Sequence, residues 1–487
     1  MKTTITLLGL GPGDPSLLTQ QAVRLLETLP EIYVRTTHHP TLAGFPASLQ
    51  VHSFDHLYEG LPSLTDVYTR IVETVLELGQ RPEGVVYAVP GHPFVAEATC
   101  PEIARHAREL GSTVKVIEGL SFIEPTLTAL GLDPLPHLAI VDALELASLH
   151  VPPFPPDAPA LIAQVHSRLV ANEVKLTLME SYPDAHPVRL VHAAGTVQQL
   201  VEVLPLHAID RSDSIGLLTC LYLPPLEKGS SFESFQEVIA HLRAPDGCPW
   251  DREQTHQTLR TNLLEETYEA LEALDADDPH KMSEEFGDLV LQITLHAQIA
   301  NEFGEFNIQH VFKGIYEKII RRHPHVFGDW KVSGVDNVLQ NWEKLKADER
   351  AAFEQENGIS TKGLLDGVAP ALPALSQAEE IQRRAARVGF DWPDVRGVVK
   401  KIGEECHELL EADDLSSRAA ELGDLLFAVV NLARHYEIDA ESALRQTNTR
   451  FRQRFAHIEA SARALGKSVN DLSLDEMERY WQEAKKL

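Results

Sequence analysis

The sequence predicts a multidomain protein in which an α/β domain is followed by two all-α helical repeats. The 487 residues are more than a single hydrophobic core usually serves. Residues 1–225 alternate short β-rich runs with helical stretches, whereas the chain beyond residue 232 places apolar residues at three- and four-residue spacing. The helical part also repeats its own landmarks. We therefore expect domains at 1–225, 232–350 and 371–487.

The charge balance limits the classes of partner. The chain has 43 Lys and Arg against 72 Asp and Glu, a net charge of −29. This excess of carboxylates argues against stable nucleic-acid binding and against an anionic membrane, and it suits a protein that binds cations. The four cysteines form no CxxC pair, and no signal peptide or apolar run of membrane-spanning length is present. We expect a cytoplasmic protein.

The α/β part is indicated by its alternation of strands and helices. Short β-rich runs such as ITLLGLG, GVVYAVPG, STVKVIEG and PALIAQV lie between helical stretches such as SLLTQQAVRLLE. This order predicts layers of helices on a partly parallel sheet. The proline-rich stretch at 151–159 is expected to separate two lobes, and the turn-rich segment at 223–231 to close the domain.

The helical part contains a duplication. Helical periodicity in TLRTNLLEETYEALEAL and MSEEFGDLVLQITLHAQIA returns after a Gly- and Pro-punctuated linker at 357–376. The motif Glu265-Glu266-x-x-Glu269 is echoed by Glu404-Glu405-x-x-Glu408, and Glu285-Phe-Gly-Asp288 by Glu421-Leu-Gly-Asp424. Later landmarks correspond at similar separations, namely Lys318 and Arg322 with Arg450 and Arg454, and Trp342-x-x-x-Lys346 with Trp481-x-x-x-Lys485.

The repeated acids point to a metal site. Residues three or four apart share one helix face, so each motif gathers like charges that repel unless a cation lies between them. Clustered carboxylate oxygens suit Mg²⁺ or Mn²⁺, and basic side chains one turn apart can clamp phosphates. A solvated helix face is the ordinary explanation of one such motif. Here the acids adjoin apolar positions and recur together with basic followers, which favours the metal site.

Residues 232–487 resemble the MazG family of nucleoside-triphosphate pyrophosphohydrolases. The first copy contains LRAPDGCPWDREQTHQTLRTNLLEETYEAL and RRHPHVFGDW, and the second contains GFDW, EECHELLEA, ELGDLLFAVVNLARH and YWQEAKK. The resemblance implies Mg²⁺-dependent cleavage of nucleoside triphosphates to nucleoside monophosphate and pyrophosphate. It also implies homodimers in which helices of two subunits complete each active site.

The family's functional residues fall on matching positions of both copies. The implied metal ligands of the second copy are Glu405, Glu408, Glu421 and Asp424, and those of the first are Glu266, Glu269, Glu285 and Asp288. The implied phosphate and nucleoside contacts are Arg450, Arg454, Trp481 and Lys485, with Lys318, Arg322, Trp342 and Lys346 as counterparts. Relatives carry a lysine at the position of Arg450, so a planar fork replaces a point charge there.

One position distinguishes the two copies. Asn431 in the second copy has a side chain that can both donate to and accept from a nucleotide base, and the aligned residue in the first copy is Leu295. In two-copy relatives the second copy usually carries the chemistry. We expect the second copy to be the active one.

Glycine-rich turns mark the ligand side of the N-terminal domain. Gly9, Gly11 and Gly13 follow a β-like run, and VPGHPFVAE and IEGLSFIEP follow two others, so all three turns are expected at one sheet edge. These segments resemble the tetrapyrrole (corrin/porphyrin) methylase family, and the whole chain resembles YabN-type methylase–MazG fusions. The resemblance implies S-adenosylmethionine held between two lobes by Gly91, His92, Val95, Leu120, Ser121 and Gln164. Many methylases have aspartate where this chain has His92.

Three functions remain open from the sequence. The first is a nucleoside triphosphate pyrophosphohydrolase with a methylase-like partner domain. The second is a tetrapyrrole-type methyltransferase whose helical half only dimerises. The third is a nucleotide sensor without turnover. Complete carboxylate sets in both copies favour the first, because scaffold helices gain nothing from clustered acids.

Overall fold

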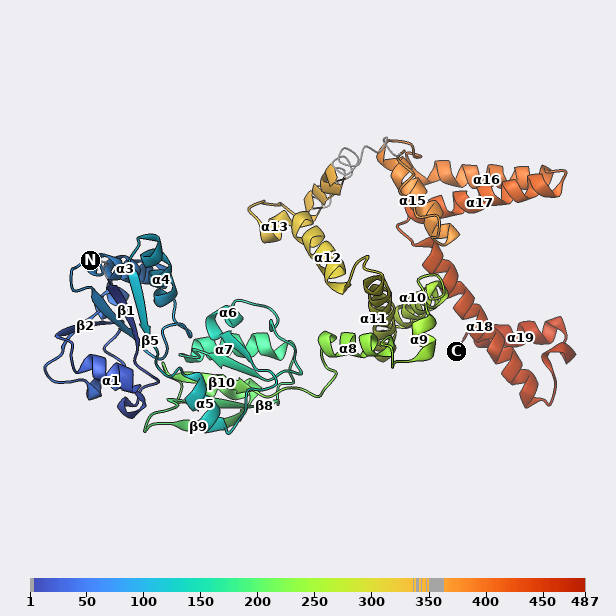
Figure 1. Ribbon diagram of the computed structural model, residues 1–487. Coiled ribbons are helices and arrows are strands. Elements are labelled where there is room, and N and C mark those ends of the chain that lie inside the picture. The colour runs from blue at the N-terminus through green and yellow to red at the C-terminus, as the bar shows by residue number, and fades with distance from the viewer. Residues whose placement is uncertain are drawn as a thin grey trace. The chain divides into compact units, whose positions relative to one another are not determined.

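The computed structural model describes residues 4–335, 337–338, 341–342, 344–346, 348–349 and 363–486. The chain divides into two compact units, Met1–Glu253 and Gln254–Leu487. The first is built from strands and helices and the second from helices (Figure 1). The expected end of the first repeat at residue 350 lies outside the described residues.

The first lobe is a parallel five-stranded sheet in the order β3-β2-β4-β1-β5. Both faces are buried, as the nearly continuous apolar runs of its strands require. One face packs on helices α3 and α4, and the other on α1. The bounds are β1 Thr4–Gly9, β2 Glu31–Val34, β3 Gln50–Ser53, β4 Val85–Val89 and β5 Thr113–Ile117, with α1 Gln20–Leu26, α2 Asp55–Gly60, α3 Leu64–Leu78 and α4 Thr99–Glu109.

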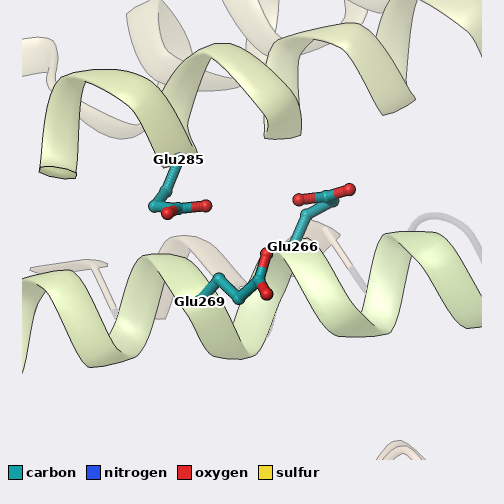
Figure 2. Close-up of side chains that lie close together, drawn as sticks. All are labelled: Glu266, Glu269 and Glu285. Carbon is teal, nitrogen blue, oxygen red and sulfur yellow. The ribbon is translucent and has the colours of Figure 1, made fainter.

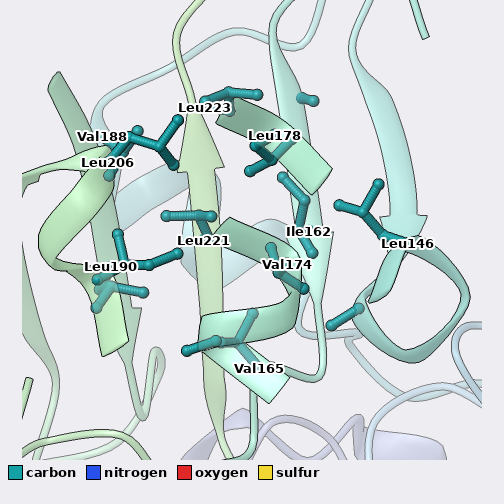
Figure 3. Close-up of a cluster of buried hydrophobic side chains, with 14 of the residues drawn as sticks. Leu146, Ile162, Val165, Val174, Leu178, Val188, Leu190, Leu206, Leu221 and Leu223 are labelled. Atoms are coloured by element: carbon teal, nitrogen blue, oxygen red, sulfur yellow. The ribbon is translucent and has the colours of Figure 1, made fainter. Parts of the chain in front are cut away.

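The second lobe is a mixed sheet in the order β6-β7-β10-β8-β9, in which only β6 and β7 run parallel. Figure 3 shows its main core, where Val174 and Leu178 of α7 meet Ile162 and Leu221 of the sheet. Helix α5 covers the opposite face. The bounds are α5 Ile123–Leu130, β6 Ala139–Asp142, α6 Ala143–Ala147, β7 Ala160–Ala163, α7 Arg168–Met179, β8 Pro187–His192, β9 Leu200–Pro205 and β10 Thr219–Leu223.

The proline-rich stretch does not separate the lobes. It lies between α6 and β7, and β6 before it pairs with β7 after it in the same sheet. The chain instead passes from one lobe to the other between β5 and β6, through α5. The expectation for residues 151–159 was wrong because prolines mark a loop without saying whether the loop ends a domain. Here they belong to the crossover that a parallel strand pair requires.

Two helix hairpins dominate the second unit. Helices α10 (Arg260–Asp275) and α11 (Pro279–Glu302) form the first, and α16 (Val395–Glu411) and α17 (Leu415–His435) form the second. Each hairpin has a short connection that ends in an aspartate cap, because Asp278 accepts from the backbone of α11 and Asp414 from that of α17. The equivalent construction confirms the two helical repeats.

The remaining helices follow these hairpins. The first compact unit ends with α8 (Phe232–Leu242) and α9 (Pro249–Glu253). After the hairpin of α10 and α11, the first repeat continues through α12 (Ile308–Arg322) and α13 (Pro324–Phe327). The second repeat includes α15 (Ala374–Arg387), α18 (Ala440–Ala464) and α19 (Leu474–Ala484). In the part of the chain that the structure describes, every helix is too short or too polar to span a membrane.

Candidate functional site

The acids of the first copy come together between two helices. Glu266 and Glu269 on α10 face Glu285 on α11, and one carboxylate oxygen of each lies within 4.8 Å of the other two (Figure 2). Burial and the neighbouring charges of Asp288, Glu269 and Glu285 raise the pKa of Glu266. Asp288 therefore lies close enough to act on the same cluster. The carboxylates of this cluster therefore repel one another.

The acids of the second copy form two overlapping groups that share one residue. Glu405 of α16 lies with Glu421 and Asp424 of α17 in one group, and with Glu404 and Glu408 in the other. Glu405 is 3% exposed. Burial together with Glu408, Glu405 and Asp424 raises the pKa of Glu421. All four expected carboxylates of this copy are thus gathered at one place on the helix pair.

A lysine that the sequence analysis did not select enters the second cluster. The Lys401 ammonium lies 2.7 Å from a carboxylate oxygen of Glu404 and 2.6 Å from one of Glu405. These hydrogen bonds raise the pKa of Lys401 and lower that of Glu404. Its position four residues before Glu405, one helical turn away, is the signal that could have identified it. Glu404 was likewise not selected.

The basic and aromatic candidates of the second copy lie on α18 and α19. The Arg454 guanidinium lies 5.5 Å from the centre of the Trp481 ring, and Phe451 packs against the same ring. Arg450 donates to Thr447 at 2.7 Å, and Lys485 caps the end of α19. Among the described residues, neither arginine forms an ion pair with a carboxylate of this chain. The cationic group and the acidic group are therefore assembled separately.

The first copy holds its basic candidates differently. Arg322 pairs with Glu349 at 2.6 Å, which together with Arg321 lowers the pKa of Glu349 to about 2 although burial opposes the shift. Lys318 is exposed on α12. The Lys346 ammonium lies 3.8 Å from the centre of the Trp342 ring. The arginine that would clamp phosphate in this copy already has a carboxylate partner.

Asn431 lies on α17, the helix that also carries Glu421 and Asp424, and is buried in a polar network. Its side-chain oxygen accepts from Arg434 at 2.7 Å, and Arg434 also pairs with Asp391 at 2.6 Å. Asn431 is 4% exposed. Because its oxygen is engaged, the amide N–H₂ is the group that can still serve a ligand.

The three glycine-rich turns of the first lobe meet as expected. Backbone hydrogen bonds link Gly11 with Gly91 in both directions, at 3.2 and 2.8 Å. A side chain at Gly9 would come within 2.5 Å of the Gly119 backbone, so only glycine allows this approach. The turns follow β1, β4 and β5, which places them at the carboxyl ends of neighbouring parallel strands.

A cavity of about 640 Å³ opens beside these turns, within the first unit. Gly91, Val95 and Gln164 line it, as do residues of both lobes. Ala96 and Gln164 line it with positive φ angles of 52° and 62°, a region that costs non-glycine residues about 1–3 kcal/mol each. Such strain is typical of ligand-binding positions.

The other three expected cofactor residues lie in the adjoining turns and do not line this cavity. Ser121 is buried and donates to Glu124 through both its backbone and its hydroxyl, and its hydroxyl oxygen accepts from the backbone of Ile123 at the start of α5. Leu120 precedes it and is half-buried. His92 accepts from the backbone of Phe94 at 3.1 Å. The imidazole thus accepts a hydrogen bond from the backbone of the turn, as the carboxylate of a short acidic side chain at this position would also do.

Comparison with known proteins agrees with this division. The model of the tetrapyrrole (corrin/porphyrin) methylases matches residues 4–210, and that of the MazG nucleotide pyrophosphohydrolase domain matches 254–327 and 395–458. The protein YabN of Bacillus subtilis (strain 168) is 42% identical over 494 residues, which cover 100% of this chain and 99% of YabN. The chain belongs to the YabN family.

Shorter relatives match only the helical half of this YabN-family chain. The nucleoside triphosphate pyrophosphohydrolase/pyrophosphatase MazG of Thermotoga maritima is 43% identical over 259 residues, 53% of this chain and 97% of that protein. The nucleoside triphosphate pyrophosphohydrolase of Escherichia coli (strain K12) is 42% identical over 255 residues, 51% of this chain and 95% of that protein. Both MazG matches within the YabN-family chain include the acidic hairpins, which confirms the predicted fusion and its fold class.

Proposed function

We propose that the chain is a nucleoside triphosphate pyrophosphohydrolase that depends on Mg²⁺ or Mn²⁺, acts in the cytoplasm, and uses its second MazG copy for catalysis. The observation that carries the proposal is the convergence of Glu405, Glu421 and Asp424 from two helices within 4.8 Å. Glu408 joins the same set through Glu405. The curated relatives named as nucleoside triphosphate pyrophosphohydrolases support the substrate class.

The donor set fits a hard divalent cation. Carboxylate oxygens are the ligands that Mg²⁺ prefers, and magnesium sites in proteins also use waters and substrate phosphates. Burial and then repulsion from the neighbouring acids raise the pKa of Glu421, and a bound cation would relieve that repulsion. When bound, such a cation polarises a phosphoryl group and activates water.

The other predicted residues would act on the triphosphate and the nucleoside. Water would attack the α-phosphorus as its bond to the oxygen that bridges the α- and β-phosphorus atoms breaks. Pyrophosphate would leave, the nucleoside monophosphate would keep the water oxygen, and the proton of the water would pass to solvent. Arg450, Arg454 and Lys485 would neutralise the phosphates, whereas Trp481 and Asn431 would contact the nucleoside. In the first copy the metal ligands would be Glu266, Glu269, Glu285 and Asp288, and the counterparts that hold substrate would be Lys318, Arg322, Trp342 and Lys346.

A homodimer would complete the site. Helix α17 exposes Leu422, Leu426 and Val429, which lie four and three residues apart on one face and are between 44% and 50% exposed. An apolar stripe of this kind on a helix hairpin suits packing against the same hairpin of a second subunit. Such pairing would also supply basic side chains to the acidic cluster from the partner subunit.

The cleft of the N-terminal domain supports a second proposal, that it binds S-adenosylmethionine. Its volume lies within the range of about 300–1,000 Å³ that is usual for small-molecule pockets. Close glycine turns and strained residues at Ala96 and Gln164 give it the features of a ligand site. Of the six predicted residues, Gly91, Val95 and Gln164 line the cleft and would contact the cofactor, whereas His92, Leu120 and Ser121 would hold the adjoining turns in place. Titration with S-adenosylhomocysteine distinguishes a cofactor-binding domain from one that has lost the function.

Pyrophosphate release from the four common ribonucleoside triphosphates, with and without Mg²⁺, tests the main proposal. Glu408→Gln or Asp424→Asn should abolish release, whereas the matched substitutions Glu269→Gln and Asp288→Asn in the first copy should leave most of it. Full activity of both second-copy variants would overturn the assignment of the chemistry to that copy. Nucleotide binding without product would instead identify a sensor.

A further inference from the structure

The cleft of the N-terminal domain contains a buried histidine that has no partner within the protein. His39 is 5% exposed, and both its ring nitrogens lack a hydrogen-bond partner among the described residues. It lines the 640 Å³ cavity together with Gly91 and Gln164. Because leaving a buried polar group unsatisfied is costly, an unpaired ring beside a cavity points to an interaction with a molecule that occupies the cavity.

The wall of the cavity also carries the acidic side chains of Asp55 and Glu59, one turn apart on α2. Asp55 accepts from the backbone and the hydroxyl of Thr37, two residues before His39. Burial opposes ionisation of Asp55, but hydrogen bonds from Thr36, Thr37 and Ser53 prevail and lower its pKa to about 2. The Asp55 carboxylate is therefore ionised at neutral pH.

The one arginine among the lining residues does not offset these charges. Arg35 pairs with Glu97, which is 8% exposed, and its Nε donates to the Tyr58 hydroxyl at 3.1 Å. The guanidinium also lies 5.5 Å from the centre of the Tyr68 ring. Its charge is paired with Glu97, and its Nε and one terminal nitrogen already donate inside the protein, so its attraction for an anion is reduced.

His39 itself adds no positive charge. Burial lowers its pKa to about 4, so the ring is neutral at physiological pH. A neutral imidazole presents one N–H donor and one acceptor nitrogen. The surrounding wall therefore offers a hydrogen-bond acceptor, two carboxylates and the aromatic rings of Tyr58 and Tyr68. That combination recognises a nitrogen that donates hydrogen bonds, charged or neutral.

We propose that His39, Asp55 and Glu59 form a subsite for a small neutral or cationic amine in the wall of the cleft. The tetrapyrroles implied by the family's name carry several carboxylates, so their charge is opposite to that of a cationic amine. The acidic wall of the cleft would repel them. The amine would lie in the cavity that Gly91 and Gln164 also line. Only its placement beside a cofactor rests on the S-adenosylmethionine proposal, since the subsite is built without it.

Two probes of equal size and opposite charge test the subsite. Binding of benzylamine and of benzoate to the full chain is measured by ligand-detected NMR, with and without S-adenosylhomocysteine. Benzylamine should bind at least about tenfold more tightly than benzoate, since close charges at an effective dielectric constant near 20 interact strongly. Benzoate binding equal to or tighter than benzylamine binding would overturn the proposal.

Variants locate the binding at the named residues. Glu59→Gln should weaken benzylamine binding about threefold, as for a partly exposed charge. Glu77→Gln, an exposed change on α3 outside the cavity, should not alter it. His39→Phe should weaken binding about tenfold, whereas His39→Gln, which keeps an acceptor, should retain it. Equal binding by wild type and His39→Phe would also overturn the subsite, and failure to bind S-adenosylhomocysteine alone would overturn only the cofactor proposal.

Discussion

The ammonium group of Lys401 lies 2.6 Å from a carboxylate oxygen of Glu405, in the acidic cluster of the second MazG copy. The aligned position in the first copy is Asn262, which has no charge to offer. The two clusters therefore place their lysines differently, since Lys281 on α11 is the lysine whose charge acts on Glu285 in the first copy. A bound divalent cation at Glu405 would have to compete with this lysine, whereas the first cluster has no such competitor at that position.

Removing the lysine should tighten metal binding by the second copy. In Lys401→Met the competing cation is lost, so Mn²⁺ affinity at pH 8 should rise about threefold, the scale of a partly exposed ion pair. Isothermal titration of the Glu269→Gln background, in which the first cluster is weakened, isolates this site. Lys400→Met, on the adjacent exposed residue, is the control and should change the affinity less. Unchanged or weaker Mn²⁺ binding in Lys401→Met would contradict the competition.

The acid cluster should also make stability depend on pH and metal together. Burial, then Glu408, Glu405 and Asp424, raise the pKa of Glu421 in the folded protein. The folded state then keeps a proton at pH values where the unfolded chain has lost it. The free energy of unfolding should therefore fall as pH rises through the interval above the ordinary glutamate pKa, and stay lower beyond it.

Thermal unfolding of the metal-free chain at pH 5 and pH 7.5 checks the sign. The midpoint of the helical transition should be higher at pH 5, and added Mg²⁺ should raise it more at pH 7.5 because the carboxylates are then ionised. Glu421→Gln should flatten the dependence on pH. A larger Mg²⁺ effect at pH 5 would show that the acids do not bind the metal.

The sequence was sufficient for the parts of the molecule that follow from local patterns. Apolar runs such as ITLLGLG gave strands buried on both faces, and glycines after β1 and β4 gave turns that meet. The duplicated acids located two helix hairpins because helical spacing alone decides which side chains share a face.

Contacts between residues distant in the chain were not accessible in the same way. Nothing in the local pattern joins Arg322 to Glu349, which are 27 residues apart. His39 is buried without a hydrogen-bond partner because of the conformation of the loop after β2. A single histidine in a sequence does not indicate whether its ring will be buried or hydrogen-bonded. Lys401 is the exception. Its four-residue spacing from Glu405 is a local pattern, but a lysine is not one of the acidic residues that define the motif.

The glycine turn of the cleft permits a matched pair of substitutions. Gly91 and Gly111 have φ angles of +69° and +74°, so alanine at either should cost about 1 kcal/mol of stability. Only Gly91 lines the cavity. Gly91→Ala should therefore weaken S-adenosylhomocysteine binding measured by calorimetry, and Gly111→Ala should not. Equal affinity in the two variants would remove Gly91 from the proposed cofactor site.

Mixing two inactive variants tests whether subunits share the catalytic site. Arg454 contacts Trp481 and forms no ion pair with the described carboxylates of its own chain, so we expect it to serve a partner subunit's cluster. Glu408→Gln and Arg454→Ala should each be inactive as homodimers. In a mixed dimer one site collects both substitutions and the other is intact, so an equal mixture should recover about a quarter of wild-type pyrophosphate release.

The control for this mixture pairs Glu408→Gln with Asp424→Asn. Both changes lie in the acidic cluster of one hairpin, so every site in the mixed dimer carries one of them and no activity should return. Recovery in this control would show that the acids themselves are shared between subunits. No recovery with Arg454→Ala, under conditions where native mass spectrometry detects mixed dimers, would show that each chain closes its own site. In that case α18 would have to turn its arginines toward the acids of the same chain when nucleotide binds.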